Sequence, residues 1–119
     1  MLLLPLEKNI ETFYRKNTIN KYQMTKRTPK QTADSEDLAL KIKALGHPAR
    51  LEILKILTDK CCICGEIVDV LPLAQATVSQ HLKVLKEAGF IIGETDGTKV
   101  CYMVNRIALD KFKSHISEL

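Results

Sequence analysis

The chain has 119 residues, which is enough for one small domain with a tail. Hydrophobic residues make up 45% of it and aromatic residues 5%, so an aliphatic core is available and disorder along the whole chain is excluded. No apolar run approaches the roughly 20 residues of a membrane-spanning helix, and residues 1–4 are too few for a signal-peptide core. We therefore expect a cytoplasmic protein that has no membrane partner.

The net charge of +4 lies entirely in the first third of the chain, because residues 35–119 carry equal numbers of basic and acidic groups. Residues 1–33 are expected to form a basic N-terminal extension, and residues 34–119 the folded domain. Met24 is an alternative start for the natural chain. A short helix is predicted in the extension, where apolar residues recur at helical spacing: Leu6, Ile10, Phe13 and Tyr14.

Two helices are predicted at the start of the domain. Asp34 or Ser35 can cap the first helix, and Gly46 ends it. Pro48 suits the first position of the second helix, whose closely spaced Leu and Ile residues predict deep burial as far as Thr58.

A short helix, a turn and a longer helix are predicted next. The short helix covers roughly residues 64–71 and is broken by Pro72, and the longer one covers residues 76–88 and is closed by Gly89. Two helices joined by such a turn are typical of a helix-turn-helix, whose second helix enters the major groove of DNA.

The hydrophobic period then changes from helical to strand-like. Residues 90–94 and 99–104 read as strands, and the Asp96-Gly97 pair between them is a strong hairpin signal. A last amphipathic helix is predicted over residues 106–117. The fold class is therefore mainly α with a β-hairpin wing, a winged helix-turn-helix. The apolar faces of its first and last helices have little core left to cover, which predicts a homodimer through them.

Three stretches in this order, residues 44–54, 62–67 and 76–89, make the chain similar to the ArsR/SmtB family of winged-helix metalloregulators. The resemblance covers roughly residues 38–112. It implies a homodimeric repressor that releases its operator when a metal or metalloid ion, or an oxidant, reaches a sensing site.

The predicted DNA-reading helix keeps its polar side chains on the side away from the core. Gln side chains pair with adenine edges, Ser, Thr and His contact bases or phosphates, and Lys contacts phosphate. We expect double-stranded operator DNA to be bound by these residues and by two on the wing: Gln75, Thr77, Ser79, Gln80, His81, Lys83, Thr98 and Lys99.

Three of the four cysteines, Cys61, Cys62 and Cys64, crowd together where the third helix begins, unlike the disulfide framework of a secreted domain. Thiolates favour soft ions, and a helix N-terminus is expected to lower the pKa of a thiol. Cys62 and Cys64 would lie on nearly opposite sides of a regular helix, so binding one ion would unwind its first turn.

Three sulfurs suit trivalent arsenic or antimony, whereas four ligands suit zinc or cadmium better. In the family, a Cys-x-Cys pair at this place is typical of arsenite or soft-metal sensors, and Cys62 and Cys64 match it. The chain lacks a further family Cys, since Ile67 stands there, and residues 1–60 hold none. Either Cys61 or Cys101 could supply the third sulfur. The alternatives are a divalent soft metal (Cd, Pb or Zn) or thiol oxidation at the same cysteines. No resident cofactor is required.

Two other readings are weaker. His115 and Glu118 resemble half of a second family metal site whose other half is absent, and His47 reads as a helix-start residue. Cys61 and Cys64 form a Cys-x-x-Cys pattern, but the strand-to-helix junction of a dithiol oxidoreductase is missing, so we expect no enzyme.

Overall fold

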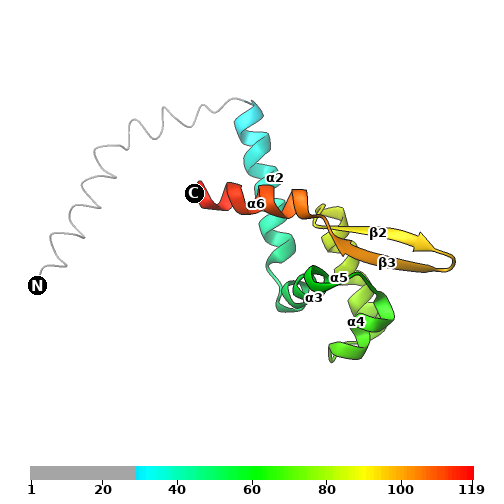
Figure 1. The fold of residues 1–119 in the computed structure, drawn as a ribbon. Coiled ribbons are helices and arrows are strands. Elements are labelled where there is room, and N and C mark those ends of the chain that lie inside the picture. The colour runs from blue at the N-terminus through cyan, green and yellow to red at the C-terminus, as the bar shows by residue number, and fades with distance from the viewer. Residues whose placement is uncertain (1–28) are drawn as a thin grey trace, which may run out of the picture. The chain divides into compact units, whose positions relative to one another are not determined.

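A computed structural model describes the backbone of residues 29–119 and the side chains from residue 34 onward (Figure 1). The short helix predicted near the N-terminus and the alternative start at Met24 lie outside the described residues. Residues Glu36–Leu119 form one compact unit. Within the described part of the chain, no helix combines the length and apolarity that crossing a lipid bilayer demands.

The predicted order of elements is confirmed, with helices first, then a hairpin, then a final helix. The elements are α2 (Pro29–Leu45), α3 (Pro48–Asp59), β1 (Cys62–Ile63), α4 (Cys64–Val70), α5 (Gln75–Glu87), β2 (Ile91–Asp96), β3 (Lys99–Val104) and α6 (Arg106–Ser117). The start predicted for the first helix at Asp34 or Ser35 is wrong, because α2 already begins at Pro29. Proline fits a first helical turn, where its missing N–H has no partner to lose.

The sheet has three antiparallel strands in the order β1-β3-β2, and β1 is a strand that the sequence did not predict. It spans two residues, with Cys62 opposite Tyr102 and Ile63 opposite Cys101. The β2–β3 hairpin projects away from the helices as the wing (Figure 1). Its last pair is Asp96 with Lys99, so the connection is shorter than predicted, and Gly97 takes the positive φ of 65° that the tight turn requires.

The core lies between α3, α4, α5 and the base of the wing. It fixes α5 through Val78, Leu82 and Leu85, all at most 1% exposed. Other fully buried side chains surround them: Ile53, Ile67, Phe90 and Cys62. Phe90 also meets Phe112 of α6 edge to face, with ring centroids 5.1 Å apart. Helix α5 is therefore held by packing on its inner side and is exposed on its outer side.

Helices α2 and α6 have large apolar side chains in solvent. Leu40 and Ile42 on α2 and Ile107 and Ile116 on α6 are exposed, Ile107 by 83%. Of the described residues in these two helices, only Ala44 and Leu109 are buried in the core. The expectation that one chain leaves these faces uncovered is thus confirmed.

Candidate functional site

Helix α5 presents a polar outer surface in the manner the sequence predicts. Five of the eight predicted DNA-contacting side chains are on this surface and exposed: Gln75, Thr77, Ser79, Gln80 and Lys83. Because the opposite side of the helix is packed into the core, these side chains can contact DNA without any loss of core packing.

The wing carries two more of the predicted contacts. Thr98 and Lys99 are exposed at the tip of the β2–β3 hairpin, where the turn meets β3. A lysine and a hydroxyl at the end of a projecting hairpin suit contacts to the phosphate backbone beside the major groove.

His81 differs from the other predicted contacts because its ring is half-buried against α3. Its centroid lies 4.4 Å from that of His47, with the ring planes tilted by 48°. Burial, followed by the charges of His47 and Arg50, lowers the pKa of His81. His47 itself caps α3, its Nδ1 accepting a hydrogen bond from the Ala49 N–H at 3.1 Å. His81 is thus a largely neutral ring that packs α5 against the start of α3. It also lies beside the exposed polar surface of α5.

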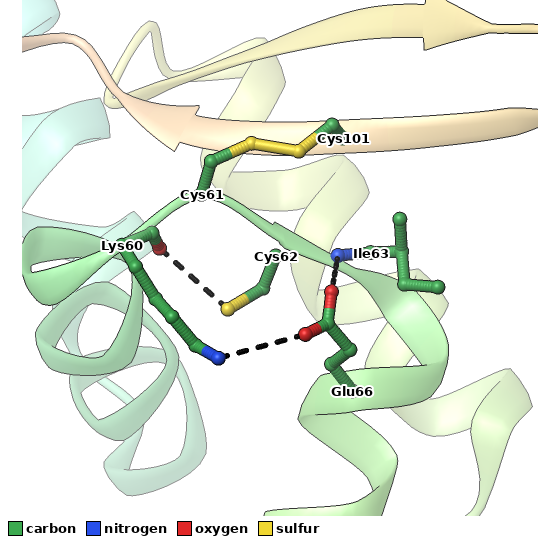
Figure 2. Close-up of polar contacts among 6 residues, drawn as sticks. All are labelled: Lys60, Cys61, Cys62, Ile63, Glu66 and Cys101. Carbon is green, nitrogen blue, oxygen red and sulfur yellow. Dashed lines mark hydrogen bonds and ion pairs between the residues drawn. A yellow bond between two sulfur atoms is a disulfide. The ribbon is translucent and has the colours of Figure 1, made fainter.

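The three clustered cysteines do not point in one direction. A disulfide joins Cys61 to Cys101 of β3, with a Cα–Cα distance of 6.1 Å, whereas Cys62 and Cys64 are free thiols. Figure 2 shows the Cys61 side chain directed toward β3 and the Cys62 sulfur directed the other way, toward the backbone of Lys60. The Cys62 thiol donates to the Lys60 carbonyl over 3.6 Å.

The sequence-based expectation of lowered thiol pKa values is wrong for both free cysteines. Burial raises the pKa of the Cys62 thiol, and the nearby Glu66 carboxylate raises it further, outweighing the opposite effect of Lys60. Burial also raises the pKa of Cys64. Desolvation therefore dominates, and both groups are thiols rather than thiolates at neutral pH.

Cys62 also lies in β1 and not in the helix. Ile63, the residue that precedes α4, has extended backbone angles (φ −83°, ψ 161°), and Cys64 is the first residue of α4. Because Cys62 precedes the helix, the opposite-side geometry expected for Cys62 and Cys64 on one regular helix does not apply.

Glu66 fixes the junction between β1 and α4, a role that the sequence analysis missed. Its Oε1 accepts a hydrogen bond from the Ile63 N–H at 3.0 Å, and its Oε2 lies 3.6 Å from the Lys60 Nζ (Figure 2). The bond to the Ile63 N–H is the main cause of the lowered pKa of Glu66. A Glu at the third position of a helix is the signal that could have revealed this contact.

A pocket of about 390 Å³ brings Cys64 together with predicted DNA contacts. The start of α4, the start of α5 and the wing line it, through Ile63, Cys64, Gly65, Gln75, Thr98, Lys99, Val100 and Tyr102. The Cys64 thiol and three predicted DNA-contacting side chains thus border the same space.

No preformed metal centre is present among residues 34–119, the part of the chain whose side chains the structure describes. No three Cys, His, Asp or Glu side chains in that range lie close enough together to hold one ion. The disulfide is one reason why no such cluster forms, because it directs the Cys61 sulfur toward β3.

The amino-acid sequence matches the family model of a helix-turn-helix domain over residues 45–94. An HTH-type transcriptional regulator of Methanocaldococcus jannaschii is 42% identical over 64 residues, which are 52% of this chain and 71% of that protein. The HTH-type transcriptional repressor SmtB of Mycobacterium tuberculosis is 43% identical over 61 residues, 51% of this chain but only 45% of SmtB. The arsenical resistance operon repressor of Bacillus subtilis is 39% identical over 67 residues, 55% of this chain and 63% of that repressor.

The fold is similar to that of a solved winged helix-turn-helix DNA-binding domain from Mycobacterium bovis, described as homodimeric and as a possible ArsR-family regulator. The two superpose with a TM-score of 0.66 at 23% identity, covering 76% of this chain and 85% of that domain.

Proposed function

This chain belongs to the ArsR/SmtB family of winged-helix transcriptional regulators, and from that premise we propose that it is a homodimeric repressor of operator DNA. The exposed polar surface of α5 and the wing tip support DNA binding. The uncovered apolar faces of α2 and α6 support a dimer, as does the homodimeric state described for the Mycobacterium bovis domain. Two α5 helices related by a two-fold axis suit a near-palindromic operator read in successive major grooves.

We further propose that trivalent arsenic, or antimony, is the inducer, bound by Cys62 and Cys64 with Cys61 in its reduced form. One observation carries the link from binding to release. Cys64 borders the same pocket as Gln75, Thr98 and Lys99, so a ligand on its sulfur would be in reach of the DNA-contacting side chains. The likeness to an arsenical resistance operon repressor supports this inducer.

The chemistry suits protonated thiols. Arsenite at neutral pH is the uncharged As(OH)₃, and three thiols replace its three hydroxyls to give three As–S bonds and three waters. Gathering the third sulfur onto the ion would pull on β1 and on the Glu66 contact that holds the start of α4. Because α4 is the first helix of the helix-turn-helix, such a shift would change the position of α5 relative to the wing.

A divalent soft metal at the same cysteines is the second candidate. The likeness to SmtB over 61 residues supports it. The raised pKa values of Cys62 and Cys64 weigh against it, because a divalent ion must displace a proton from each thiol that it binds.

The test is operator binding by fluorescence anisotropy, with a duplex selected from a randomised library and with protein reduced and then freed of reductant. Arsenite, Cd²⁺ and Zn²⁺ are titrated separately into the wild type and into a Cys62→Ser/Cys64→Ser variant. We expect arsenite to release the wild type and leave the variant bound. Release by Cd²⁺ or Zn²⁺ alone would favour the second candidate, and release of both proteins by arsenite would place the inducer site elsewhere.

A further inference from the structure

Cys61 and Cys101 occupy one face of the sheet and Cys62 the other, while Cys64 begins α4. Ile63 stands opposite Cys101 in the β1–β3 register, and side chains alternate along an extended segment. Cys61 therefore lies on the same face as Cys101, and Cys62 lies on the other face, as Figure 2 shows. Cys61 is exposed and Cys101 half-buried, whereas Cys62 is only 1% exposed.

The Cys61–Cys101 bond encloses the whole DNA-reading part of the chain. The two cysteines are 40 residues apart in sequence, and α4, α5 and β2 all lie between them. Without the bond, β1 is held to β3 by a ladder of only two residue pairs. The disulfide thus fastens the entry to the helix-turn-helix to the second strand of the wing.

We propose that Cys61 and Cys101 are a reversible dithiol–disulfide couple whose oxidation withdraws Cys61 from metalloid binding. The effect on metalloid binding rests on the proposed function, whereas the reversible Cys61–Cys101 disulfide does not. In the oxidised state only Cys62 and Cys64 remain as thiols, so three-sulfur coordination of arsenic is not completed. In the reduced state Cys61 is free to supply the third sulfur. The redox state thereby decides whether the repressor can respond to its inducer.

A small-molecule disulfide is the oxidant class that fits an exposed thiol. The Cys61 thiolate attacks one sulfur of that disulfide, forming a mixed disulfide and expelling one thiolate. The Cys101 thiolate then attacks the Cys61 sulfur and expels the second thiolate. The two protons from the cysteines end on the two released thiols, so two cysteine thiols are oxidised and one small disulfide is reduced. A small dithiol reverses both exchanges and is itself oxidised.

Exposure explains why this pair should react first. Cys61 is exposed, whereas Cys62 is buried and Cys64 half-buried, so Cys61 is the thiol that a dissolved disulfide reaches most readily. Cys61 is accessible, and its partner is already within bonding distance across the sheet.

The experiment treats the reduced full-length protein with graded glutathione disulfide and removes small molecules before two readouts. Peptide mass spectrometry after alkylation maps the disulfides, and native mass spectrometry measures arsenite binding. We expect a Cys61–Cys101 peptide pair to form first, with Cys62 and Cys64 still alkylated. Arsenite binding should weaken at least about tenfold and return after treatment with dithiothreitol.

The matched control is Cys101→Ser, which keeps the three clustered cysteines but lacks the partner of Cys61. It should bind arsenite like the reduced wild type, and several times more oxidant should be needed to halve that binding. The proposal is overturned if the first disulfide contains Cys62 or Cys64, if the variant loses binding at the same oxidant dose, or if the reduced variant does not bind arsenite. If the reduced wild type does not bind arsenite, then arsenic is not the inducer and Cys61 is not withdrawn from an arsenic site. The peptide map alone then tests whether Cys61 and Cys101 form a reversible disulfide.

Discussion

Cys62 and Cys64 are protonated at neutral pH because burial raises the pKa of both thiols, and this separates the two candidate inducers. A divalent ion releases one proton for each thiol it binds, so its affinity should rise with pH, by about tenfold per pH unit for each proton released. Binding of As(OH)₃ exchanges thiol protons for water and leaves no net proton in solution. Its affinity should therefore stay nearly flat over roughly pH 6 to 8, below the thiol pKa values.

Native mass spectrometry or calorimetry of the reduced protein at several pH values measures both dependences. The Cys62→Ser/Cys64→Ser variant, titrated in parallel, measures binding at any other sites, which is then subtracted. Thiolates would have to take up protons to release the arsenite hydroxyls as water, so an arsenite affinity that falls as pH rises, beside a flat Cd²⁺ affinity, would contradict the protonated state of the two thiols.

Gln80 and His81 are neighbours in sequence but should respond differently to truncation. Gln80 is exposed, so Gln80→Ala should weaken operator binding by about 1–3 kcal/mol while leaving the thermal unfolding midpoint almost unchanged. His81→Ala removes the ring that packs on His47, so it should also lower the unfolding midpoint, consistent with a loss of about 0.5–1.5 kcal/mol. Anisotropy and thermal melts on the two variants test this, and equal melting points would show that the ring contact contributes nothing.

What the sequence could reveal about single residues depended on local spacing. The period of Val78, Leu82 and Leu85 predicted the inner side of α5, and with it the exposed positions on the other side. The contact of His81 with His47 joins residues from different helices, and no local pattern contains it. For the same reason the pairing of Cys61 with Cys101 was not predicted, because it depends on the register between β1 and β3.

We expect the wing to contribute to DNA binding through Lys99, which is exposed at its tip. Lys99→Ala should weaken binding of operator and of unrelated DNA by similar factors and lower the slope of log affinity against log salt by about one. Lys55→Ala removes the same charge from an exposed position on α3, outside the predicted interface, and is the matched control. Salt titrations by anisotropy measure the slopes, and identical slopes for the two variants would remove the wing from the interface.

Elements with a clear hydrophobic period were predicted well, the short helix α4 among them, whereas the strand β1 was missed. The predicted bounds of α6 agree with the structure, and those of α5 differ by one residue at each end. Strand β1 has only two residues, which is too short for any hydrophobic period, and it forms because β3 lies beside it. Missing β1 also made the geometry expected for Cys62 and Cys64 wrong, because a helical spacing was applied to an extended segment.

The whole molecule should be a dimer held by the uncovered faces of α2 and α6. Leu40→Glu combined with Ile107→Glu places two charges on these faces, where the native side chains are 65% and 83% exposed in one chain. Because a buried interface disfavours unpaired charge, we expect the variant to sediment as a monomer and to lose high-affinity operator binding. Val70→Glu changes a similarly exposed residue on α4 and should remain dimeric. A Leu40→Glu/Ile107→Glu variant that still sediments as a dimer would place the interface elsewhere.

If arsenic is the inducer, arsenite binding and operator binding oppose each other within one small domain. Thermodynamic reciprocity makes this measurable from the inducer side, because the factor by which arsenite weakens DNA binding must equal the factor by which DNA weakens arsenite binding. The most direct measurement is the arsenite Kd of the reduced protein, free and then saturated with operator duplex. We expect a Kd at least about fivefold higher on DNA. Equal values in the two states would mean that arsenic, even if bound by the cysteines, does not control the repressor.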